Sequence, residues 1–87
     1  MSILKISIRQ IKAARSLLGW SQDDLAAASG ISKPTIGRLE SIDTTAPIGG
    51  RQETGEALVV ALEKAGVEFI AENGGGAGVR MKKRGKR

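Results

Sequence analysis

The side chains within the segment KPTIGR, residues 33–38, are the ones in this 87-residue chain best suited to bind another molecule. Arg38 carries a guanidinium whose fork of donors matches the two acceptors on the major-groove edge of guanine. Lys33 can reach a base or a phosphate, and Thr35 suits a phosphate or the methyl group of thymine. Gly37 permits close approach of a partner. These residue types, taken together, match the edges and the phosphates of a nucleic acid duplex.

Short capped helices must position these side chains. Ser7 and Ser21 are each followed three residues later by a capping-box partner, Gln10 and Asp24, and Ser32 begins a third, weaker repeat of the pattern. The apolar spacing that follows each serine is helical. We expect helices over residues 8–18, 22–29 and 33–41, and a fourth from about residue 52 to residue 66.

The two middle helices meet at a tight glycine turn. Ala26 is small where the two helices would approach closely, Gly30 tolerates the left-handed backbone of a sharp turn, and Ile36 can fill the angle between them. This layout is typical of a helix-turn-helix DNA reader, with the motif over residues 22–41. The alternative is an ordinary capped helical hairpin within a bundle.

The chain resembles the Cro/phage-repressor-type helix-turn-helix regulators, the XRE family, over about residues 7–66. The resemblance lies in SQDDLAAASGISKPTIGRLE, residues 21–40. It implies that Gln22 anchors the DNA backbone and that the second motif helix reads bases. The expected DNA-binding residues are Gln22, Ser32, Lys33, Thr35, Arg38 and Arg51. The alternative for these residues is an ordinary surface role, such as a solvated charge or an ion pair with a neighbouring acid.

Arg15 interrupts the apolar stripe of the first helix, and Glu40 ends the inward face of the third. Because an unpaired buried charge is costly, an inward arginine needs a carboxylate partner. We therefore predict a structural ion pair between Arg15 and Glu40, which the family resemblance also implies.

The C-terminal part departs from the helical pattern. Residues 67–70 and 79–81 alternate as short strands, separated by AENGGGAG, whose glycines suit a hairpin loop rather than a phosphate cradle. We expect a mainly α, four-to-five-helix domain over residues 1–66, a β-hairpin over 67–82 and a disordered basic tail over 83–87. The expected dimerisation residues are Val59, Val67, Phe69, Val79 and Met81.

Composition narrows the possible functions. The chain contains no cysteine and no histidine, so it offers neither disulfides nor thiolate metal sites, nor the commonest general base. We expect no enzyme activity, metal or cofactor. The net charge of +5 is concentrated in residues 80–87, which hold six of the 14 basic residues. The remainder is close to neutral, so its DNA binding would depend on a local patch.

From these features we expect a sequence-specific regulator of transcription that acts as a homodimeric repressor on an inverted repeat in double-stranded DNA, its own gene being one candidate target. It would be cytoplasmic and nucleoid-associated, without a membrane segment. Two alternatives remain open: an antitoxin or controller protein of a toxin, restriction or mobile-element system, and a module on the same fold that binds a small protein partner instead of DNA.

Overall fold

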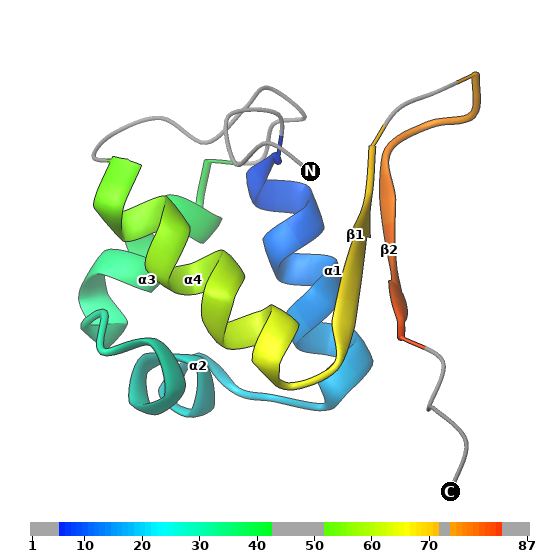
Figure 1. Ribbon diagram of the computed structural model, residues 1–87. Helices are drawn as coiled ribbons and strands as arrows, with labels where there is room; N and C mark the ends of the chain where they lie inside the picture. Colours follow the sequence, from blue (N-terminus) through cyan, green and yellow to red (C-terminus); the bar gives the residue numbers. More distant parts are fainter. Residues whose placement is uncertain (1–5, 43–51, 72–73, 83–87) are drawn as a thin grey trace, which may run out of the picture.

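The computed structural model of the protein describes residues 6–42, 52–71 and 74–82. Within these ranges the chain forms four helices and a C-terminal β-hairpin (Figure 1). The elements, in order, are α1 (Ile8–Leu18), α2 (Gln22–Ser29), α3 (Lys33–Glu40), α4 (Gln52–Lys64), β1 (Val67–Ile70) and β2 (Gly78–Met81). The predicted mainly α fold with a C-terminal hairpin is confirmed. The third and fourth helices end slightly earlier than expected. Arg51 and the tail at 83–87 lie outside the described residues.

The serine caps form as predicted. Ser7 Oγ accepts a hydrogen bond from the Gln10 backbone N–H at 3.3 Å, while Gln10 Oε1 accepts one from the Ser7 N–H at 3.0 Å. Ser21 and Asp24 form the same reciprocal box at 3.1 and 2.9 Å. Each box satisfies two backbone donors that would otherwise lack partners, which fixes where α1 and α2 begin.

Gly30 sets the angle between α2 and α3. Its φ of 77° lies in the left-handed region, and its N–H donates to the Ala26 carbonyl at 2.9 Å. Residues with a Cβ atom adopt this backbone only at a cost, so glycine is favoured here. The tight turn lets Leu25 and Ile36 both become fully buried.

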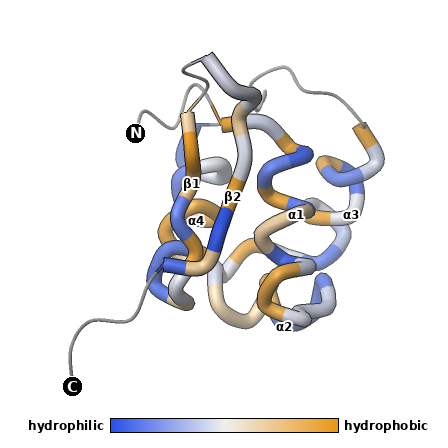
Figure 2. The backbone as a smooth tube through the Cα atoms, turned by 90° about the vertical axis from the view of Figure 1, so that its right-hand side faces the viewer, coloured by the Kyte–Doolittle hydropathy of each residue, from blue (hydrophilic) through white to orange (hydrophobic). Residues whose placement is uncertain are grey.

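The hairpin covers the side of the helical unit opposite α3. It packs on α1 and α4, and α1 lies between the hairpin and α3 in both views (Figures 1 and 2). The strands pair antiparallel, with Phe69 opposite Val79 and Val67 opposite Met81. Val67 and Phe69 point into the core, because alternate residues of a strand face the same side.

Gln10 ties the hairpin to α1 in addition to capping the helix. Its Nε2 donates to the carbonyl oxygens of Gly78, at 3.0 Å, and of Ile70, at 3.4 Å. Gln10 therefore uses both ends of its amide, one for its own helix and one for the hairpin. Nothing in the sequence pattern around residue 10 pointed to the second role.

Three of the expected dimerisation residues lie in the core of the protomer. Val59, Val67 and Phe69 are only 5%, 2% and 7% exposed, so the prediction that they line a dimer surface is wrong. The hairpin packs against α4, and Val59 belongs to the same buried cluster as Val67 and Phe69. Val79 is half-buried, and Met81 is exposed.

Candidate nucleic-acid interface

The outward face of α3 carries the predicted contact residues. Ile36 and Glu40 are buried and fix the inward stripe of the helix, while Lys33 and Arg38 are exposed and Thr35 is half-buried. No other residue in the described part of the chain forms an ion pair with Arg38.

The beginning of α2 lies beside this face. Lys33 Nζ is 3.4 Å from Asp23 Oδ2. The Gln22 side chain lies next to the backbone of Gly37: if residue 37 carried a Cβ atom, that atom would be 3.5 Å from Gln22 Oε1. The first turn of α2 and the exposed side of α3 thus form one continuous surface. Its outward charges are mixed, because Asp23 and Asp24 occupy the first turn of α2, where acidic residues favour the helix dipole.

The hydroxyl groups at the start of α3 bond to each other. Ser32 Oγ and Thr35 Oγ1 are 2.9 Å apart, and Ser32 Oγ also accepts the Thr35 backbone N–H at 3.4 Å. Ser32 is exposed in spite of these bonds. The cap orders both side chains at the edge of the surface.

The predicted ion pair between Arg15 and Glu40 is present and joins α1 to the end of α3. Arg15 Nε and Nη2 donate to the two carboxylate oxygens of Glu40 at 3.0 and 2.9 Å. Arg15 Nη1 donates to the Trp20 carbonyl at 2.8 Å, immediately before the Ser21 cap of α2. This two-pronged pair in a partly buried site therefore holds α1, the start of α2 and the end of α3 together.

Sequence reasoning missed two contacts at this surface. Asp23 pairs with Lys33, and the Gln22 side chain donates to Glu40 at 3.0 Å. The family resemblance implies that Gln22 anchors the DNA backbone, and the structure shows that one of its amide hydrogens is used within the protomer. Gln22 and Glu40 are 18 positions apart, and no periodic signal in the sequence pairs them.

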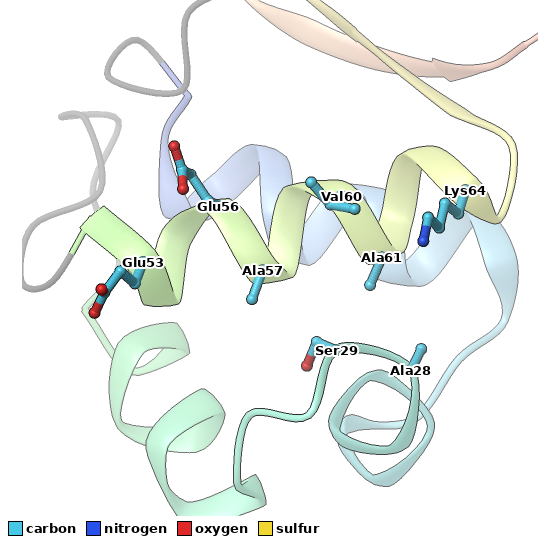
Figure 3. Close-up of a pocket in the computed structure, with 8 residues that line it drawn as sticks. All are labelled: Ala28, Ser29, Glu53, Glu56, Ala57, Val60, Ala61 and Lys64. Carbon is cyan, nitrogen blue, oxygen red and sulfur yellow. The ribbon is translucent and has the colours of Figure 1, made fainter.

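An open groove of about 440 Å³ lies between the C-terminal end of α2 and α4 (Figure 3). Its lining residues are Ala28, Ser29, Glu53, Glu56, Ala57, Val60, Ala61 and Lys64. The one hydroxyl among them, Ser29 Oγ, accepts the Ile31 backbone N–H at 3.1 Å, which tightens the turn before α3.

Two capped helices crossing at a left-handed glycine, with polar and basic side chains on the outer face of the second, define a helix-turn-helix domain. A family model described as Helix-turn-helix matches residues 11–47, from within α1 past the end of α3. The chain is therefore similar to this family over those residues, which supports the predicted resemblance to XRE-family regulators. A search of curated proteins finds no match.

Within the described ranges, none of the helices combines the length and the apolar character that crossing a membrane requires.

Proposed function

We propose that this protein is a sequence-specific regulator of transcription that binds double-stranded DNA through the face formed by α3 and the first turn of α2. The observation that carries the proposal is the exposure of Lys33 and Arg38 on α3, beside the start of α2. A helix has the right diameter to enter the major groove, where base edges present distinct patterns of donors and acceptors.

Each residue of the face then has a separate task. Arg38 donates two hydrogen bonds to the acceptors of a guanine and supplies sequence preference. Lys33 neutralises a phosphate or reaches a base, and Gln22 together with the exposed cap at Ser32 and Thr35 fixes the position of the protein on the backbone. The surface carries acids as well as bases, so we expect specific contacts to provide more of the affinity than charge alone.

We further propose that the protein acts as a homodimer that represses transcription from an inverted-repeat site, its own promoter being one candidate. Two α3 helices related by a two-fold axis would enter successive major grooves about 34 Å apart. Exposed Val60 and Met81 and the half-buried Val79 are apolar residues that a second protomer could cover. Bound there, the dimer would exclude polymerase from an overlapping promoter.

Selection from a random-sequence duplex library, followed by gel shifts with the enriched duplex, tests the proposal. We expect wild-type protein to enrich a discrete sequence, and Arg38→Ala to weaken its binding by about 5- to 150-fold, the usual range for losing a base-reading arginine. Lys64→Ala is the matched control, since it removes an exposed cation from α4 and should change binding less than twofold. Failure to retard any duplex at low salt would reject the proposal.

A further inference from the structure

The side chain of Gln22 is held in a fixed orientation before any partner arrives. Its Nε2 donates to Glu40 Oε1 at 3.0 Å, across the junction between the start of α2 and the end of α3. A carboxylate only accepts hydrogen bonds, so the NH₂ group must be the end that faces Glu40. The Gln22 carbonyl oxygen consequently faces Gly37, where a Cβ atom would lie 3.5 Å away.

Glu40 is itself a rigid anchor. Its side chain is only 4% exposed, and both of its oxygens accept hydrogen bonds from Arg15. Arg15 is fixed in turn by its bond to the Trp20 carbonyl. The orientation of Gln22 therefore depends on a chain of charge-assisted hydrogen bonds that runs back to α1, rather than on its own rotamer preference.

Among the described residues, the second N–H of the Gln22 amide has no hydrogen-bond partner beside the bond that the first makes to Glu40. It lies at the first residue of α2, where backbone N–H groups also lack helical partners and attract anions. Holding a donor in place before binding removes the entropy cost of ordering a flexible side chain, which improves affinity without a new contact.

We propose that Glu40 is a positioning residue for DNA binding: it orients Gln22 so that the remaining amide N–H donates to a phosphate oxygen. The ion pair with Arg15 then serves recognition as well as folding. This inference rests on the proposed function, because it assumes that the surface of α2 and α3 binds a duplex. It assigns to Glu40 an effect on binding that is transmitted entirely through Gln22.

A double-mutant cycle tests this coupling. Dissociation constants are measured by fluorescence anisotropy for wild type, Gln22→Ala, Glu40→Gln and the double variant, with a labelled duplex selected by wild type from a random-sequence library. We expect each single change to weaken binding about 3- to 10-fold, the range for the net contribution of one typical hydrogen bond. The double variant should be within twofold of Glu40→Gln alone, because both changes remove the same contact.

Glu40→Gln leaves Arg15 without its carboxylate and can unfold the domain, so a second variant keeps the core intact. Gln22→Asn retains the amide donors but is one methylene too short to reach Glu40 from the same backbone. If Glu40 positions the donor, Gln22→Asn should bind as weakly as Gln22→Ala.

The salt dependence of DNA binding should not change in either variant, because a neutral amide releases no counterion. Gln52→Ala, at the first residue of α4, is the matched control and should bind as wild type does.

The outcomes separate the two proposals. If wild type enriches no duplex, the proposed function fails. If wild type binds a selected duplex but Gln22→Asn binds equally well, or the costs of the two single changes multiply in the double variant, Glu40 does not act through Gln22 and only this inference is overturned.

Discussion

At the scale of single residues, the surface formed by α3 and the start of α2 carries one exposed arginine and two polar side chains that have partners within the protomer. Arg38 extends from the last turn of α3, whereas Lys33 lies 3.4 Å from Asp23 and Gln22 is bound to Glu40. The types of these residues were readable from the sequence, because basic and amide side chains at such spacing suit a duplex. Their partners were not, since each pairing depends on how two helices cross.

Asp23 should oppose DNA binding while it stabilises the helix. Asp23→Asn frees Lys33 and removes a negative charge near the phosphates, so we expect affinity for the selected duplex to rise about two- to fivefold, the scale of one exposed ion pair. The same change removes an acid from the first turn of α2 and should lower the free energy of unfolding by about 0.3–1 kcal/mol. Anisotropy and urea denaturation measure the two effects.

Glu63→Gln is the control for this prediction, because it removes an exposed acid from α4 without touching α3. It should leave affinity unchanged within twofold. Equal gains from both changes would mean that net charge, rather than the pairing of Asp23 with Lys33, limits binding.

At the scale of elements, the residues near each helix end were enough to predict the helices, but they did not predict how the hairpin packs on them. Serine caps at residues 7, 21 and 32 fix where three helices start because they satisfy backbone donors within a few residues. The contact of Gln10 with Gly78 spans 68 positions and leaves no local trace. Val59 was assigned to the wrong surface for the same reason, since its burial depends on the packing of elements far apart in the sequence.

Gln10→Glu separates the two roles of Gln10. A carboxylate can still accept the Ser7 N–H and preserve the cap of α1, but it cannot donate to the Ile70 and Gly78 carbonyls and would repel them. At pH 7 we expect the backbone amides of β1 and β2 to exchange with deuterium at least about tenfold faster than in wild type, because the lost bonds contribute about 0.5–1.5 kcal/mol each.

Amides of α3 provide the internal reference for that experiment, since α1 separates α3 from the hairpin in Figures 1 and 2. Their exchange should change much less than that of the hairpin. Unchanged exchange in β1 and β2 would show that apolar packing alone holds the hairpin in place.

At the scale of the whole molecule, the protein has two different sides. One bears α3 and the first turn of α2, and the other bears the hairpin, where Glu68 and Arg80 form an exposed ion pair at 2.9 Å. The hydrogen bond and positive charge of Arg80 hold the pKa of Glu68 below its usual range. The mainly α fold and the helix-turn-helix were predictable from sequence, whereas the surface that a second protomer would use was not, because it depends on which valines the hairpin buries.

An NMR titration shows directly whether the outer face of α3 binds duplex DNA. The selected duplex is titrated into labelled protein while backbone and side-chain amide shifts are followed. We predict the largest changes at residues 22–24 and 33–38 and at the side-chain amide of Gln22, with β1 and β2 nearly unchanged. Shifts centred on the hairpin or on the groove between α2 and α4, with α3 unperturbed, would contradict the account.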